Sequence, residues 1–69
     1  MNPVSQQRPN KRLYTLKEGA IYLGLGIWAV RKRIWKGEIP FVRASKRRVL
    51  LDIRDMDSWI ESNKERFSD

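Results

Sequence analysis

The sequence predicts a small α+β domain, mainly α-helical, with two short helices joined by a tight turn, a β-hairpin and a closing helix. Three observations predict it. A Thr-x-x-Glu sequence opens a helix at residue 15, glycines end the first two helices at positions 24 and 37, and residues 41–51 gather β-branched and apolar side chains around a basic turn. A chain of 69 residues forms one small domain, which buries only about 60% of its unfolded surface.

The first helix is predicted to begin after Thr15, which pairs with Glu18 in a capping box. Leu13 precedes the cap as the expected outer residue of a hydrophobic staple. Gly19 weakens the helix by about 1 kcal/mol relative to alanine, so we expect close approach of the second helix there. Gly24 ends the helix in a left-handed conformation. The apolar face has i, i+4, i+7 spacing and consists of Leu16, Ala20 and Leu23.

The second helix is predicted from about residue 27 to residue 36, with Gly26 as its N-cap and Gly37 after its end. At 100° per residue, one side should pack on the first helix through Ile27, Val30 and Ile34. Residues 31–36 contain four cations and no acid, whereas a structural surface helix usually mixes charge signs to gain i,i+4 pairs. This bias indicates an anionic partner for the outward side, which carries Trp28, Lys32, Trp35 and Lys36, with Ala29, Arg31 and Arg33 on its flanks.

A β-hairpin is predicted next, with strands over residues 41–43 and 48–51 and a turn over residues 44–47. The turn is small and basic, and a short linker joins it to the basic helix. This layout is expected of a protein that binds both a DNA groove and the phosphate backbone. An ordinary solvated turn is the alternative.

The third helix should begin after Asp52, a good N-cap, with Asp55 near its positive N-terminal end. Trp59 is expected in the core. An acidic outer face should point away from the basic elements. Residues 63–69 are expected to fray, and docking of Phe67 on the domain is the alternative. The acidic face comprises Asp55, Asp57, Glu61 and Glu65.

The charge is strongly asymmetric along the chain. Residues 1–48 hold twelve Lys/Arg and two acidic residues, and residues 49–69 hold three Lys/Arg and six acidic residues, so the net charge of +7 divides into +10 and −3. Such asymmetry indicates a polyanion on one side of the molecule. We divide the chain into a flexible basic arm (1–12), a domain (13–62) and a tail (63–69).

Composition disfavours several classes of function. The chain has no cysteine and no histidine, so it lacks thiolate ligands, the commonest neutral metal ligand and the usual general base. We therefore expect no enzymatic activity, cofactor or metal. No apolar run approaches the roughly 18 residues of a membrane span, and we expect a cytoplasmic protein, associated with the nucleoid when bound to DNA.

Together, residues 13–60 resemble the excisionase-type helix-turn-helix domain, which is related to the winged DNA-binding domain of MerR-type regulators. The basic positions of the family's wing are filled here by Lys46, Arg47 and Arg48. The other matching segments are residues 14–18, Ala20 and residues 22–25, 30–32, 36–40 and 52–60.

The resemblance implies a winged helix-turn-helix whose second helix enters the major groove and whose wing contacts the adjacent minor groove or backbone. Trp28 and Trp35 are large for positions that are often small or polar in the family. We expect Trp35 to pack, and leave base contact and partner contact open for Trp28. The implied groove residues are Trp28, Ala29, Arg31, Lys32 and Lys36. The implied wing residues are Arg43, Ser45, Lys46, Arg47 and Arg48.

The predicted function is sequence-specific binding of double-stranded DNA, as an excisionase (recombination directionality factor) of a phage or integrative element. A small phage-type transcriptional regulator is the alternative that uses the same module. An alternative of another class is a protein-interaction module with the exposed tryptophans as anchors. Expected partners are double-stranded DNA, a second copy bound cooperatively on DNA, and an integrase, but no membrane.

Overall fold

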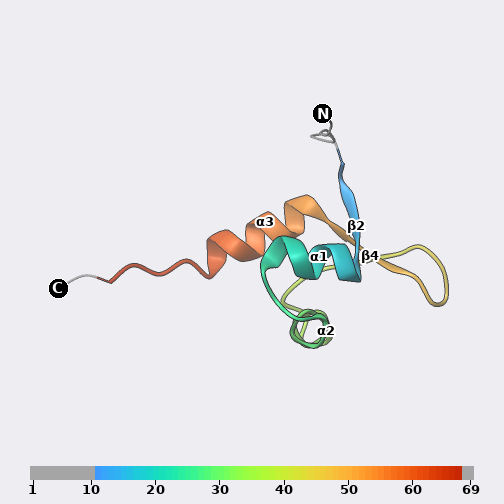
Figure 1. Cartoon of the computed structure of the whole chain (residues 1–69), viewed down its shortest axis with the longest axis horizontal. Coiled ribbons are helices and arrows are strands. Elements are labelled where there is room, and N and C mark those ends of the chain that lie inside the picture. The colour runs from blue at the N-terminus through green and yellow to red at the C-terminus, as the bar shows by residue number, and fades with distance from the viewer. Residues whose placement is uncertain (1–10, 68–69) are drawn as a thin grey trace.

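The computed structural model describes residues 11–67, and Figure 1 shows how their elements are arranged. Within this range the chain forms three helices and a three-stranded antiparallel sheet, which confirms the α+β class. The elements in order are β2 (Leu13–Thr15), α1 (Leu16–Leu23), α2 (Ile27–Trp35), β3 (Val42–Arg43), β4 (Val49–Asp52) and α3 (Ile53–Ser62).

The sheet has the order β2-β4-β3, so β4 is the central strand. The predicted hairpin is confirmed, with Val42 opposite Leu50 and Arg43 opposite Val49. The strand β2 was not predicted. Leu13, expected as a staple residue, instead pairs with Asp52 in this strand. Three residues are too few for an alternating pattern to be visible in the sequence.

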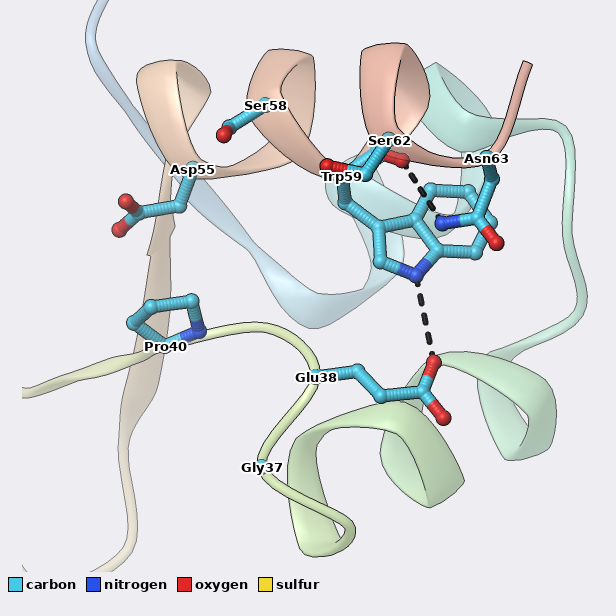
Figure 2. A pocket seen from close by; sticks show the side chains of 8 residues that line it. All are labelled: Gly37, Glu38, Pro40, Asp55, Ser58, Trp59, Ser62 and Asn63. Carbon is cyan, nitrogen blue, oxygen red and sulfur yellow. Dashed lines mark hydrogen bonds between the residues drawn. The ribbon is translucent and has the colours of Figure 1, made fainter.

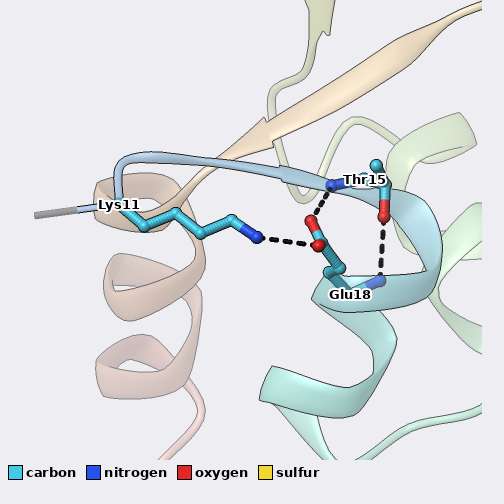
Figure 3. Close-up of polar contacts among 3 residues, drawn as sticks. All are labelled: Lys11, Thr15 and Glu18. Atoms are coloured by element: carbon cyan, nitrogen blue, oxygen red, sulfur yellow. Dashed lines mark hydrogen bonds and ion pairs between the residues drawn. The ribbon is translucent and has the colours of Figure 1, made fainter. Parts of the chain in front are cut away.

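The predicted capping box opens α1 (Figure 3). The backbone N–H of Glu18 donates to Thr15 Oγ1 at 3.1 Å, and the N–H of Thr15 donates to Glu18 Oε1 at 2.9 Å. Lys11 Nζ lies 2.7 Å from Glu18 Oε2, and the pKa of Glu18 is lowered chiefly by this lysine. At the other end Gly24 has φ 72°, the left-handed conformation predicted for it.

The core takes one or more residues from each helix and from the central strand. Its fully or almost fully buried members are Ala20 of α1, Val30 of α2, Leu51 of β4, Met56 of α3 and Ile39 of the α2–β3 connection. Trp59 packs against this core while remaining partly exposed. Ile27 is 39% exposed and does not pack on the core, so the predicted inner face of α2 is confirmed for the buried Val30 and the half-buried Ile34 but not for Ile27.

Gly19 permits a close approach, but to other elements than predicted. A Cβ atom at this position would lie 2.6 Å from Leu51 Cδ1 and 3.3 Å from Met56 Sδ. The neighbours are therefore β4 and α3, and not α2. The prediction was wrong about the partner, because the side of α1 that carries Gly19 faces the sheet and α3.

Asp52 caps α3 as predicted, with Arg54 N–H donating to Asp52 Oδ1 at 2.9 Å. Arg12 Nε also donates to Asp52 Oδ2 at 3.0 Å, and the Arg12 carbonyl accepts from Ile53 N–H at 2.8 Å. Residues 1–10 of the expected arm lie outside the described residues, and Lys11 and Arg12 are joined to the domain. At the far end Phe67 is fully exposed and is not docked.

Candidate nucleic-acid interface

The outward side of α2 presents the predicted groove residues to solvent. Trp28 and Trp35 are 68% and 66% exposed, and Arg31, Lys32 and Lys36 are also exposed. Ala29 is half-buried, so it is the least accessible of the five predicted residues. The N-cap of α2 is Gly26, which makes no side-chain cap bond, and Lys36 is its C-cap rather than its last helical residue.

Arg33 was predicted to flank this side, but it is half-buried and turned toward α3. Its Nη1 donates to the Ala29 carbonyl at 3.2 Å, and its guanidinium lies 5.8 Å from the ring centre of Trp59 on α3. Glu38 Oε1 accepts a hydrogen bond from Trp59 Nε1 at 3.3 Å. Arg33 therefore joins α2 to α3, and this leaves Arg31, Lys32 and Lys36 as the outward cations of the run.

The hairpin tip, defined as residues 45–48, is exposed and consists of Ser45, Lys46, Arg47 and Arg48. Backbone bonds close it: Ala44 N–H donates to the Arg48 carbonyl at 2.9 Å, and Arg48 N–H donates to the Ser45 carbonyl at 3.3 Å. Arg43 Nη1 donates to the Lys46 carbonyl at 3.1 Å while its guanidinium lies 5.4 Å from the ring centre of Phe41. Arg43, which was predicted to contact DNA, thus also stabilises the hairpin tip through a hydrogen bond to its backbone.

A groove connects α2 to the hairpin. It consists of two adjoining hollows that share Leu16, Arg31, Arg47 and Val49 as lining residues. We call it the basic groove, because its charged lining residues are Lys17, Arg31, Arg47 and Arg48. Arg31 and Arg47, which were predicted as a recognition-helix residue and a wing residue, both line this groove. Lys17 was missed, because nothing in the local sequence of α1 shows that its first turn faces the hairpin.

The cations of the basic groove, of outward α2 and of the hairpin tip have no carboxylate partner among the described residues. The ion pairs among residues 11–67 are Lys11–Glu18, Arg12–Asp52 and Lys64–Glu61, and none of them involves these cations. Positive charge on α2 and the hairpin is therefore uncompensated within residues 11–67.

Between α1 and α3, Asp57 accepts a hydrogen bond from the Tyr22 hydroxyl at 2.5 Å, which raises the pKa of Tyr22.

The two exposed tryptophans of α2 contact each other. Their ring centres are 5.8 Å apart and their planes meet at 72°, an edge-to-face arrangement. Trp35 was expected to pack, but only this edge contact and one wall of the basic groove involve it, and the ring stays mostly exposed. We call Trp28 and Trp35 the tryptophan ridge.

A separate hollow lies between α3 and the α2–β3 connection (Figure 2). Glu38 and Asp55 face it from opposite sides, with the Trp59 indole between the two walls. No group of three or more acidic, histidine or cysteine side chains in the described range could hold a metal ion. The acidic character of this hollow separates it from the basic groove.

Comparisons of the chain with protein-family models, curated proteins and solved structures found no match. None of the helices in the described range is long and apolar enough to cross a membrane.

Proposed function

We propose that the protein binds double-stranded DNA sequence-specifically as a winged helix-turn-helix. In this proposal α2 lies in the major groove and the hairpin tip follows the phosphate backbone. The observation that carries the proposal is the basic groove, which Arg31 of α2 lines together with Arg47 and Arg48 of the hairpin, and which has no carboxylate among its lining residues. A helix fits the major groove, which is about 12 Å wide, and unpaired cations beside it would neutralise phosphates.

The residues divide into two groups by the contact that each can make. Lys17, Lys46, Arg47 and Arg48 lie around the helix rather than on it, and they are suited to phosphates, which fix the position of the protein on the duplex. Lys32 and Arg31 project from α2 and are suited to the acceptor edges of guanine. Phosphate contacts would supply most of the affinity, and base contacts would supply the preference for one sequence.

DNA titration at several salt concentrations tests the proposal. The duplex would be a site selected from random oligonucleotides, with a scrambled duplex beside it. Replacing Lys46 or Arg47 by alanine should weaken binding to both duplexes equally and reduce the slope of log K against log salt by about one unit for each lost phosphate contact. Replacing Lys32 by alanine should cost about 1–3 kcal/mol on the selected duplex and relax the preference at one position.

Lys64→Ala is the matched control, because it also removes one positive charge but lies after α3 in a pair with Glu61. It should leave the affinity and the salt slope close to those of the unaltered protein. If the α2 and hairpin variants behave like Lys64→Ala, the proposed interface is wrong.

For the biological role, we propose an excision accessory factor of a phage or integrative element, on the resemblance of residues 13–60 to excisionase-type domains. A phage-type transcriptional regulator would use the same surface. A recombination assay with the cognate integrase separates the two roles: an excision factor raises the yield of excised product, whereas a regulator changes transcription from a promoter that carries its site.

Cooperative binding is part of this proposal. A module of this size buries roughly 600–1,000 Å² on DNA, so neighbouring copies on repeated sites would add affinity. Footprinting on one, two and three adjacent sites should show steeper saturation as the number of sites rises. One independent, non-cooperative footprint per site would contradict it.

The tryptophan ridge favours a second candidate function, a protein-interaction module. Aromatic anchors surrounded by cations would suit an acidic protein partner. NMR chemical-shift mapping distinguishes the two functions. DNA should shift the amide signals of α2 and the hairpin tip together, whereas a protein bound at the ridge alone should shift α2 and leave Lys46 and Arg47 unchanged.

A further inference from the structure

The tryptophan ridge is an exposed apolar feature on the side of α2 that carries the exposed cations Arg31, Lys32 and Lys36. Trp28 and Trp35 are seven residues apart, nearly two helical turns, and their side chains lean together until the ring centres are 5.8 Å apart. Each ring is about two-thirds exposed, at 68% and 66%. The two indoles therefore form one raised apolar surface along the outward side of α2.

The surroundings of the ridge define the chemistry of its partner. Arg31 and Lys32 lie on the turn of α2 between the two tryptophans, and Lys36 follows Trp35. None of these cations pairs with a carboxylate among residues 11–67. A partner that fits this surface presents negative charge and apolar groups side by side.

The major groove of DNA has this combination. Phosphates line its edges, and the C5-methyl group of thymine is the apolar group that base pairs display on its floor. We propose that the tryptophan ridge contacts thymine methyl groups, so that the binding site carries thymines at one or two fixed positions opposite α2. This inference rests on the proposed function and adds the chemical identity of the bases that the helix reads.

Other occupants of the ridge fit the structure less well. Two copies meeting ridge to ridge would bring Arg31 and Lys32 of both copies together, and like charges at such an interface are unfavourable. Single-stranded nucleic acid stacks successive bases flat on aromatic faces, whereas two rings that meet at 72° cannot both take part in one stack of parallel bases.

The experiment replaces thymine by deoxyuridine, which removes the methyl group and keeps the base pairing. Each thymine of the selected site is replaced in turn, and the dissociation constant is measured at fixed salt. Because one buried carbon is worth about 0.8 kcal/mol, the loss of a contacted methyl should weaken binding about fourfold. Replacement at an uncontacted thymine should change the dissociation constant less than about 1.5-fold.

The same duplexes are then titrated with Trp28→Ala and Trp35→Ala. If the ridge reads the methyl, each variant should bind the thymine duplex several-fold more weakly and lose the thymine–deoxyuridine difference at one position. Ile21→Ala is the control, because Ile21 is an apolar side chain of α1, 75% exposed, outside the proposed interface. It should keep the full difference. Urea unfolding of each variant checks the fold, which should be retained because the substituted side chains are exposed.

Three outcomes would overturn the inference. If deoxyuridine leaves the dissociation constant unchanged at every position, the protein does not contact a thymine methyl group, although DNA binding and the proposed function stand. If the tryptophan variants still bind the thymine duplex more tightly than the deoxyuridine duplex, another side chain contacts the methyl group. Tryptophan variants that bind DNA normally but change the oligomeric state measured by sedimentation make the ridge an interface between copies. Absence of any DNA binding would instead reject the proposed function itself.

Discussion

Gly19 shows how the requirement for one small residue arises from packing between three elements. Its missing side chain makes room for Leu51 of β4 and Met56 of α3, both fully buried. Glycine in a helix costs about 1 kcal/mol relative to alanine, so the close approach must be worth more than that to the fold.

We therefore expect Gly19→Ala to destabilise the protein despite the higher helix propensity of alanine. The new Cβ would lie 2.6 Å from Leu51 Cδ1, and overpacking of this kind costs about 1–3 kcal/mol. The measurement is the free energy of unfolding in urea. The double variant Gly19→Ala/Leu51→Val should recover part of the loss, and a Gly19→Ala variant more stable than the unaltered protein would contradict the packing.

Asp52 predicts how stability changes in acid. Its pKa lies below the ordinary value of 3.8, first because Arg54 N–H binds the ionised carboxylate and then because Arg12 pairs with it. Glu18 likewise has a pKa below 4.5, chiefly through Lys11. Both groups bind protons more weakly in the folded protein than in the unfolded chain, so their contribution is present above these ordinary values and is lost as the pH falls through the lowered pKa.

The urea midpoint should thus stay level from pH 7 to about pH 5 and decline as the pH falls further. Asp52→Asn should be less stable at pH 7 and show a shallower decline in acid. Glu65→Gln, which alters an exposed acid of the tail, should decline as the unaltered protein does. An unchanged slope for Asp52→Asn would show that its carboxylate is not responsible.

At the scale of the element, α2 depends on the rest of the fold more than on its own sequence. It has nine residues, a glycine N-cap without a side-chain bond and no acid in its first turn. Isolated helices of this length are marginal in water. The buried Val30 and the partly buried Ile34 hold it against the core, which leaves the other side free for the exposed cations and the tryptophan ridge.

The two glycines of the α1–α2 turn should respond oppositely to the same substitution. Gly26 has φ −77°, and a Cβ atom added there would meet nothing within 4 Å, so Gly26→Ser should cap α2 and raise stability by about 0.5–1 kcal/mol. Gly24 also has open space but φ +72°, so Gly24→Ser should lower stability by about 1 kcal/mol through backbone strain. Thermal unfolding measures both, and equal shifts would refute the role given to φ.

The hairpin is a second element whose end extends beyond the helices, as Figure 1 shows. Its strand β3 has two exposed residues and pairs with β4 at two positions. Arg43 adds to this limited strand pairing, because it donates a hydrogen bond to the Lys46 carbonyl and its guanidinium lies over the Phe41 ring. The structure therefore gives a stiffening role to one of the predicted DNA contacts, and leaves the tip cations exposed.

For the whole molecule, the distribution of charge has a cost that salt should relieve. The chain carries a net charge of +7, and the described ion pairs leave the cations of α2 and the hairpin without partners. Mutual repulsion of these groups opposes the compact state. Raising NaCl from about 20 mM to about 300 mM shortens the Debye length to below 10 Å, and the melting temperature should rise.

The double variant Lys46→Gln/Arg47→Gln removes two of these charges and should melt at a higher temperature at low salt, with a smaller rise on adding salt. Lys64→Gln/Glu61→Gln, which removes an ion pair and leaves net charge unchanged, serves as control. A melting temperature that falls with salt would mean that attractive pairs dominate the electrostatics of the fold.

The sequence by itself determined the features that depend on neighbours within a few residues. The capping box of Thr15 and Glu18, the left-handed Gly24 and the Asp52 cap all involve contacts up to a few positions away, and their residue types predict them directly. The uneven placement of charge was likewise readable, because it is a property of composition along the chain.

Only the tertiary structure decided which residues meet across the fold. The pairing of Leu13 with Asp52, the burial of Ile39 and the neighbours of Gly19 depend on contacts between distant segments. The same holds for the site: Lys17 joins the basic groove, whereas Arg33 turns toward Trp59. Helical periodicity places a side chain around its own axis, but the packing of one element on another decides whether that direction leads to solvent, to the core or to a partner.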